Sequence, residues 1–503
     1  MSKRNSYLLP ILLFWACTSE PVKVGSNEVP KAVEEATGVS SADVAVARSS
    51  GPDISNPTSG DTKTEPASLA VSKANLTLDE VYALAVTRTE RMAMRQESVI
   101  QAEAQKNQAV GSWIPSLSFR DAQSTYIPNN HARIAKEQQQ QRQLQAILTG
   151  QSLLAASTTT SQTLTTGVPS RALVLHIPIF TGLNEYAGVK AAEPLIQQRR
   201  RELFHDAGRF YLEIAQAYFT VLQYESSLKS QEEVLALSRQ NLAQLEYFVG
   251  LGKARRTDLS SARTTIARSE ATIQATRDAL SSNRERLATL TGTTVGAILK
   301  RDLTWAEPSF TRDQADAVAD QRADVEAARS SLEVAKASLT AAWGGHLPSV
   351  FVDGYYGLPQ HNRTYTKDIY AQLTIQVPIF SGGVVTAKIK QAESEKRQAE
   401  LALSQTKRLA ALEIRQAYDA WRASREEVLA YKKALDAAQQ NYAFQSDYYA
   451  RRLVTILDLL TSLTSLAQAK DDYERALLQE KLNRIWIGVA VGELPIRKSA
   501  SKG

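Results

Sequence analysis

An internal duplication constrains the fold of this chain more than any other feature of its sequence. The motif Pro-Ile-Phe-Thr-Gly at residues 178–182 returns as Pro-Ile-Phe-Ser-Gly at 378–382, and Glu-Ile-Ala-Gln-Ala-Tyr at 213–218 returns as Glu-Ile-Arg-Gln-Ala-Tyr at 413–418. Further pairs keep the same separation of 200 residues: Gln240-Asn241 with Gln440-Asn441, Asp258-Leu259 with Asp458-Leu459, and Gly292 with Gly492. About 115 residues therefore align without a gap, which indicates two copies of one structural unit.

The spacing between the copies changes upstream of these matches. Residues 113–117 (Trp-Ile-Pro-Ser-Leu) match residues 346–350 (His-Leu-Pro-Ser-Val), a separation of 233 residues. The first copy therefore carries about 33 additional residues before Pro178. They fall in a Gln- and Thr-rich stretch, about 131–170, which interrupts no periodic segment and is predicted to form an enlarged loop.

Each copy is predicted to contain a helix, a strand, a loop, a strand, a very long helix, a tight turn and a second long helix. Apolar side chains recur with helical spacing in both copies, at Ile214, Ala217, Tyr218 and Val221 and at Ile414, Ala417, Tyr418 and Trp421. Residues 388–449 contain no Gly or Pro. A helix of that length spans roughly 90 Å, which exceeds a globular core, so it must pack as a coiled coil.

The predicted strands have one apolar and one polar face. In the second copy, one face carries Ala371, Leu373, Ile375 and Val377, and the other carries Tyr370, Gln372, Thr374 and Gln376. The sequence contains no run of about 18 apolar residues, so membrane insertion would have to use these strands. Four strands cannot close a barrel, and an open sheet in lipid leaves backbone groups unpaired. If the strands enter a membrane, several chains must share one barrel.

The first residues have the pattern of an export signal. Lys3 and Arg4 precede a short apolar core that ends at Cys17, the only cysteine of the chain. This position is typical of a lipoprotein signal, so we expect cleavage before Cys17 and its lipidation; an ordinary signal peptide with an incidental cysteine is the alternative. The predicted segments are a signal peptide (1–16), a disordered tether (17–75), the first repeat (76–292), an inter-repeat linker (293–319), the second repeat (320–492) and a C-terminal tail (493–503).

Neither the charge nor the motifs indicate an enzyme or a nucleic-acid-binding protein. The 59 basic and 53 acidic residues give a net charge of +6 and are interspersed along helical stretches, which is typical of solvated helix faces. The five histidines lack metal-ligand spacing. The stretch Gly250-Leu-Gly252-Lys253 lacks the first glycine and the Ser/Thr of a phosphate loop. We therefore predict no catalytic, cofactor-binding or metal-binding residues.

The order of these motifs, repeated twice, resembles the TolC-like outer membrane efflux proteins from about residue 76 to residue 492. Residues 76–81 (Leu-Thr-Leu-Asp-Glu-Val) are similar to the family's opening helix. The two Pro-Ile-Phe-Thr/Ser-Gly motifs are similar to its strand-to-helix signature. Arg-Ala-Asp-Val at 322–325 resembles the Arg-Pro-Asp-Leu/Val that opens its second repeat, with Ala323 in place of proline.

The resemblance implies a mainly α-helical protein with a small β part that works as a homotrimer. Long antiparallel coiled coils would form an α-barrel through the periplasm, and four strands per chain would contribute to a shared 12-stranded β-barrel in outer-membrane lipid. The chain would be a passive duct of a tripartite efflux pump or type I secretion system, with a periplasmic adaptor and an inner-membrane pump as partners. A periplasmic coiled-coil adaptor or scaffold is the alternative function, although adaptors normally have a single hairpin flanked by small β domains.

The resemblance also implies functional residues at the periplasmic tips of the two helical hairpins, where the family has Gly-x-x-Ser/Thr-x-x-Asp-Leu. The first tip keeps the glycine but has Arg255 at the hydroxyl position, whereas the second keeps the hydroxyl but has Arg452 in place of glycine. The tip residues expected to contact an adaptor are Gly252, Thr455, Leu259 and Leu459.

A periplasmic gate is expected beside these contacts. Asp458 would form a negative ring with its copies, and Thr461 stands where the family often has a second aspartate. Tyr449, Asp258 and Thr257 occupy the positions of the family's gate contacts, while Val454 replaces the gate arginine, leaving open whether Arg451 or Arg452 substitutes. The alternative is that Asp258 and Asp458 only cap helices.

Overall fold

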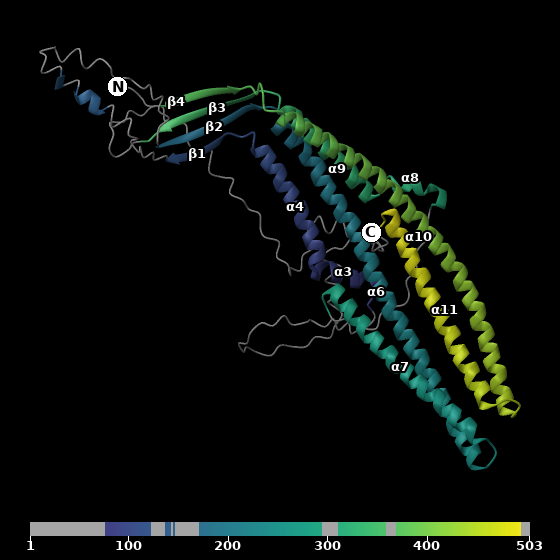
Figure 1. The fold of residues 1–503 in the computed structure, drawn as a ribbon. Helices are drawn as coiled ribbons and strands as arrows, with labels where there is room; N and C mark the ends of the chain where they lie inside the picture. The colour runs from purple at the N-terminus through teal and green to yellow at the C-terminus, as the bar shows by residue number, and fades with distance from the viewer. Residues whose placement is uncertain are drawn as a thin grey trace, which may run out of the picture. The chain divides into compact units, whose positions relative to one another are not determined.

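The computed structural model describes residues 76–121, 136–141, 144–145, 171–293, 310–358 and 369–493. The predicted signal peptide with Cys17, the tether, and nearly all of the enlarged loop and of the C-terminal tail lie outside these residues. The elements of the first copy are α3 (Leu78–Arg88), α4 (Glu90–Gly111), β1 (Ser116–Asp121), β2 (Arg171–Thr181), α6 (Asn184–Gly250) and α7 (Arg256–Thr291). Those of the second are η1 (Arg312–Gln314), α8 (Ala315–Ala319), α9 (Ala323–Gly344), β3 (Ser349–Gly357), β4 (Ile369–Gln376), α10 (Val384–Ala450) and α11 (Ile456–Val491). The prediction of a mainly helical chain with four strands is confirmed (Figure 1).

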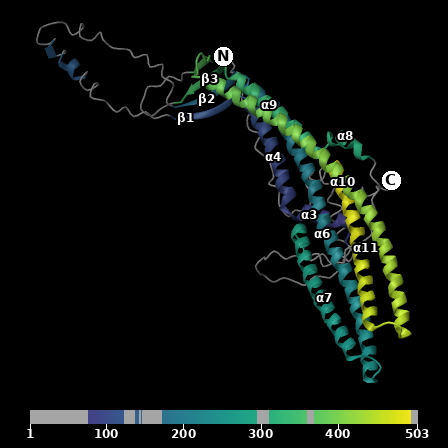
Figure 2. The same cartoon turned by 45° about the vertical axis from the view of Figure 1, so that its right-hand side comes forward.

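The duplication is visible in the lengths of the elements. Helices α4 and α9 each have 22 residues, α6 and α10 each have 67, and α7 and α11 each have 36. Figures 1 and 2 show α6 beside α7 and α10 beside α11, so each copy forms one long helical hairpin. The absence of helix breakers in residues 388–449 explains why α10 continues without interruption.

The end of the expected linker 293–319 is instead ordered helix. A capping box between Thr311 and Gln314 starts η1, and α8 follows directly. Ala315 and Ala319 of α8 are buried in a cluster with Ile414, Ala417 and other residues of α10. The sequence did not indicate these short helices, because small alanines carry little sequence signal and their burial depends on a distant helix.

The chain forms two compact units. The helical unit contains the described parts of Met1–Ala102, Leu195–Ser331 and Ala399–Gly503. Its main core joins α3 to α6: Tyr218 donates to the carbonyl of Leu76 (2.9 Å) and Tyr211 to the carboxylate of Asp79 (2.9 Å). The Arg-Ala-Asp-Val motif lies in this unit, where the Arg322 side chain is 4% exposed and binds Asp324, Glu413 and the carbonyl of Ala490. It thereby ties the start of α9 to α10 and to the end of α11.

The sheet unit contains Glu103–Pro194 and Leu332–Gln398, so far as they are described. Its four strands form one antiparallel sheet in the order β1-β2-β3-β4. The two strand pairs have equivalent registers, since Ser116 lies opposite His176 and Ser349 lies opposite Gln376. A β-bulge interrupts β2 between Pro178 and Phe180 where it pairs with β3.

Candidate functional site

The two hairpin tips have the same turn geometry. In the first tip, the N–H of Gly252 donates to the carbonyl of Val249 (3.0 Å) and that of Lys253 to Phe248 (2.8 Å). In the second tip, the N–H of Arg452 donates to Tyr449 (2.9 Å) and that of Leu453 to Tyr448 (2.8 Å). This is the Schellman pattern, which requires a left-handed residue after the helix. Gly252 adopts it with φ 69° and Arg452 with φ 63°.

The second tip starts its outgoing helix with a complete capping box. The Thr455 side chain accepts from the backbone N–H of Asp458 (3.2 Å), and the Asp458 carboxylate accepts from the N–H (2.9 Å) and the hydroxyl (2.6 Å) of Thr455. These hydrogen bonds from the hydroxyl and the backbone lower the pKa of the Asp458 carboxyl, which therefore stays ionised at neutral pH. Thr455 is thus the N-cap of α11, and Asp458 completes its capping box.

The first tip lacks this device. Arg255 occupies the cap position of α7 and makes no side-chain capping bond, whereas the second tip has Thr455 at the equivalent position. Asp258 is half-buried and Thr257 is exposed. Only one of the two tip aspartates therefore acts as a helix cap.

An apolar cluster, the tip cluster, joins the two hairpins near their ends. Its buried members are Leu245, Ala262, Ile456, Leu459 and Leu460, and the side chains packed around them include Leu242, Val249, Ala254, Leu259, Tyr442 and Tyr449. Leu459 is only 3% exposed. Leu459, one of the expected adaptor contacts, is therefore packed between the hairpins in the single chain. Leu259 is half-buried in the same cluster, whereas Gly252 and Thr455 are exposed.

The structure brings the expected gate residues to the same end of the helical unit but does not join all of them. Burial in the tip cluster raises the pKa of Tyr449, and no hydrogen bond joins its hydroxyl to Asp258 or Thr257 within the described chain. Thr461 is exposed, and its hydroxyl donates to the carbonyl of Leu457 (2.7 Å).

The two candidate substitutes for the gate arginine have other partners. Arg451, just beyond the end of α10, forms an ion pair with Asp447 of that helix (3.0 Å). The guanidinium of Arg452 lies 5.3 Å from the ring centre of Phe248. In the single chain, Arg452 is therefore a contact between the hairpins.

The sheet has a second candidate functional surface, its apolar face. Residues that lie opposite one another on neighbouring strands share a face, so the register places apolar side chains of all four strands together. They include Leu117, Phe119, Leu173, Leu175, Val352, Leu373 and Ile375. Several are well exposed, with Leu117 and Ile375 above 60%. An exposed apolar face of this extent marks a site of contact with another molecule or with lipid.

The other face of the sheet carries most of its polar side chains, beside a few apolar ones such as Val174 and Phe351. His176 Nδ1 lies 2.7 Å from the carboxylate of Asp353, and Gln372 pairs with Asp353 from the next strand. Both outer strands, β1 and β4, have a strand on only one side in the described sheet. Such edges present free backbone groups that can pair with a further strand.

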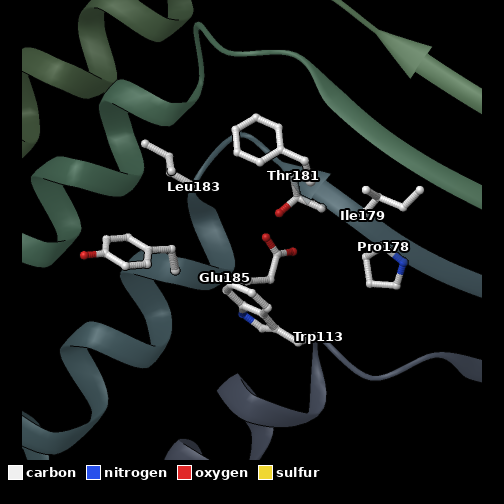
Figure 3. Close-up of a pocket in the computed structure, with 8 residues that line it drawn as sticks. Trp113, Pro178, Ile179, Thr181, Leu183 and Glu185 are labelled. Atoms are coloured by element: carbon white, nitrogen blue, oxygen red, sulfur yellow. The ribbon is translucent and has the colours of Figure 1, made fainter.

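A small cavity of about 160 Å³ lies where β2 passes into α6 (Figure 3). Trp113, Phe180 and Tyr186 supply aromatic walls, and Figure 3 shows the Glu185 carboxylate directed toward Thr181. Sequence reasoning missed this cavity. The available signal was Trp113, an aromatic residue just beyond a helix and two residues before Pro115, which recurs in the second copy as Pro348.

No described helix is long and apolar enough to cross a membrane. No group of three or more His, Cys, Asp or Glu side chains in the described part of the chain is arranged to hold a metal ion.

Comparison with known proteins gives a consistent result. The profile of the outer membrane efflux protein family matches residues 315–493. TolC of Vibrio cholerae is 28% identical over 293 residues, which are 53% of this chain and 66% of that protein. TolC of Escherichia coli is 25% identical over 311 residues, 58% of this chain and 62% of that protein. The matched region thus spans slightly less than two-thirds of these relatives.

Solved structures show the same fold. The outer membrane protein VceC of Vibrio cholerae superposes with a TM-score of 0.67 at 17% identity, over 83% of this chain and 96% of that one. The CmeC outer membrane channel of Campylobacter jejuni gives a TM-score of 0.67 at 14% identity, over 88% and 94%. With the duplicated hairpins and the four-stranded sheet, these matches show that the chain has the fold of the outer membrane channels VceC and CmeC and that its residues 315–493 are similar to the outer membrane efflux protein family.

Proposed function

We propose that the chain is the subunit of a trimeric channel that lies in the cell outer membrane and extends into the periplasm. The observation that carries this proposal is the two-faced sheet with both edges open. An apolar face suits lipid, and a polar face suits a water-filled lumen. The open edges would have to be satisfied in lipid, because unpaired backbone groups there are costly.

Three copies supply enough strands to close the barrel. Four strands are too few, whereas a 12-stranded barrel falls within the known range. In this arrangement, β4 of each copy pairs with β1 of the next, so no edge remains. A soluble adaptor or scaffold would have no use for an exposed apolar sheet face, which makes that alternative less favoured.

The helical hairpins would form the periplasmic part of the duct, with their tips toward the partners. A periplasmic adaptor and an inner-membrane pump, of a tripartite efflux or type I secretion system, would open it. Gly252, Thr455 and the half-buried Leu259 remain proposed adaptor contacts. We assign the chain a passive role without a catalytic step.

The proposal is tested on the purified, detergent-solubilised protein. Its protein mass by light scattering should be that of a trimer, and its insertion into a planar bilayer should give stable ionic conductance. A monodisperse monomer with intact β-sheet circular dichroism would overturn the barrel.

Asp458 is proposed as the constriction residue of this channel, with Thr461 beside it. Its carboxylate is exposed and ionised, so three copies at a common axis would attract cations and disfavour anions. Tyr449, Asp258 and Thr257 would hold the closed tip.

Bilayer recordings separate this role from helix capping. Asp458→Asn should reduce cation preference and block by a multivalent cation, whereas Thr455→Ala removes the cap, keeps the charge and should retain both. Asp258→Ala should instead raise the open fraction. Unchanged reversal potential and block in Asp458→Asn would exclude Asp458 from the constriction.

A further inference from the structure

A close contact between two glycines fixes the junction of helix and sheet inside the chain. Gly182, in the turn after β2, packs against Gly344, the last residue of α9. A Cβ atom added to Gly344 would overlap the carbonyl oxygen of Gly182, and one added to Gly182 would lie 2.5 Å from the carbonyl oxygen of Gly344. Only glycine fits on either side of this contact.

The internal repeat places a second pair of glycines at the equivalent positions. Gly382 follows β4 as Gly182 follows β2, and both have a positive φ (61° and 66°). Gly111 ends α4 as Gly344 ends α9, in helices of equal length. The turns that follow are also alike, since the N–H of Ile114 donates to Gly111 and that of Leu347 to Gly344.

The two glycines of this second pair, Gly111 and Gly382, have no packing partner in the single chain. A Cβ atom added to Gly111 or to Gly382 would meet nothing within 4 Å. The side chains just before Gly382 are also uncovered, with Ile379 94% and Phe380 88% exposed. In the first copy, by contrast, Phe180 pairs with Val350 of β3 and lines the cavity beside Trp113.

We propose that residues 377–383 of one copy dock on the end of α4 and on β1 of a second copy, with Gly382 packed against Gly111. This inference rests on the proposed trimer and names the contact that joins its subunits. The partner is a second copy of this chain, because Gly182 packs against Gly344 within the chain and Gly382 and Gly111 are the repeat equivalents of these two residues. The junction between β2 and β3 within the chain is thus repeated between β4 and the neighbour's β1.

The repeat also sets the register of the subunit junction. Within the chain, Phe180 lies opposite Val350 and Ile177 opposite Val352. The equivalent pairs between copies are Phe380 with Leu117 and Val377 with Phe119. All of these are apolar and share the apolar face, although a shift of one residue would place polar side chains there. The apolar face therefore continues across the junction, which an unrelated register would not achieve.

Gly111→Ala tests the contact without disturbing the chain itself. The single chain has room for the methyl group, and Gly111 is still part of α4 and has no positive φ, so alanine is compatible with its backbone. The folded chain should keep its circular dichroism, while the monomer fraction in detergent at a fixed protein concentration should rise at least about tenfold, a change worth about 1.4 kcal/mol for each of the three subunit contacts. Gly250→Ala is the matched control, because Gly250 also ends a long helix with nothing within 4 Å, and it should leave the trimer intact.

Gly344→Ala is the second control. This substitution disrupts the equivalent contact between Gly344 and Gly182 within the chain, so it should impair folding of the sheet unit as well as trimer assembly. A Gly111→Ala protein as fully trimeric as wild type, with the same melting temperature, would overturn the glycine contact and leave the channel standing. A monomeric wild-type protein would instead overturn the proposed function.

Discussion

At the scale of single residues, the two tips solve the same turn with different side chains. A left-handed backbone costs a non-glycine residue about 1–2 kcal/mol. Arg452 bears this cost at the position where the first tip has Gly252. Its guanidinium recovers part of it by lying over the ring of Phe248, a contact worth about 0.5–1 kcal/mol at an exposed site.

Arg452→Gly is therefore expected to stabilise the second tip by up to about 1 kcal/mol. Hydrogen exchange of the tip amides measures this locally. The reciprocal change Gly252→Arg serves as the control and should destabilise the first tip. If Arg452→Gly instead speeds exchange at both tips, the contact with Phe248 outweighs the backbone strain.

The capping box at Thr455 predicts a pH dependence confined to the second tip. The folded-state pKa of Asp458 is lowered, so its contribution is present above the ordinary value of about 3.9 and is lost as pH falls through the lower folded-state value. The early amides of α11 should thus lose protection in acid. Thr455→Ala should cost about 1 kcal/mol at neutral pH and flatten this dependence. Thr257→Ala, whose side chain caps nothing in the first tip, should change neither; an unchanged acid response in Thr455→Ala would refute the role of the box.

At the scale of elements, disulfide cross-linking can test the proposed register between the segment after β4 of one copy and β1 of the next. In a Cys17→Ser background, the double variant Leu117→Cys with Phe380→Cys should link each copy to the next on oxidation. The expected product is a covalent trimer on a non-reducing gel. Ser118→Cys with Phe380→Cys places the thiols on opposite faces and should not link. Equal yields from both pairs would show that the register is not fixed.

The sequence predicted the long helices and the strand faces because both follow from local periodicity. It could not distinguish the two Pro-Ile-Phe motifs, which are identical over residues 178–180 and 378–380. The first is part of β2, since β3 lies beside it, while the second follows β4 without a strand partner in the described sheet. The different conformations of the two motifs therefore follow from the presence or absence of a neighbouring strand and not from the motif sequence.

The candidate site divides in the same way. The cap formed by Thr455 and Asp458 was predictable, because a hydroxyl three residues before an acid is a local pattern. The burial of Leu459 was not, because it depends on Leu245 and Ala262 of the other hairpin, about 200 residues earlier. The lack of a packing partner at Gly111 was not predictable either, because it becomes informative only by comparison with Gly344, which packs against Gly182.

At the scale of the whole molecule, Cys17 is proposed to anchor the mature chain. The intact mass of the purified protein should correspond to a chain that begins at Cys17 and carries lipid. Cys17→Ser should abolish the added mass without preventing trimer formation, because the barrel would hold the protein in the membrane by itself. A mature protein that starts elsewhere and lacks lipid would exclude the anchor and leave the channel unaffected.

The equal helix lengths of the two repeats mean that a change of length in one hairpin affects its contact with the other. The tip cluster holds Leu459 of one hairpin against Leu245 of the other, so both hairpins must reach the same level. Shortening both arms of one hairpin by seven residues would retract its tip by about 10 Å and pull the cluster apart. An insertion or deletion in the arms of one hairpin alone should therefore weaken the tip cluster. The two 67-residue helices therefore set the same length twice, and a change in the depth that the hairpins span requires an equal change in both helices.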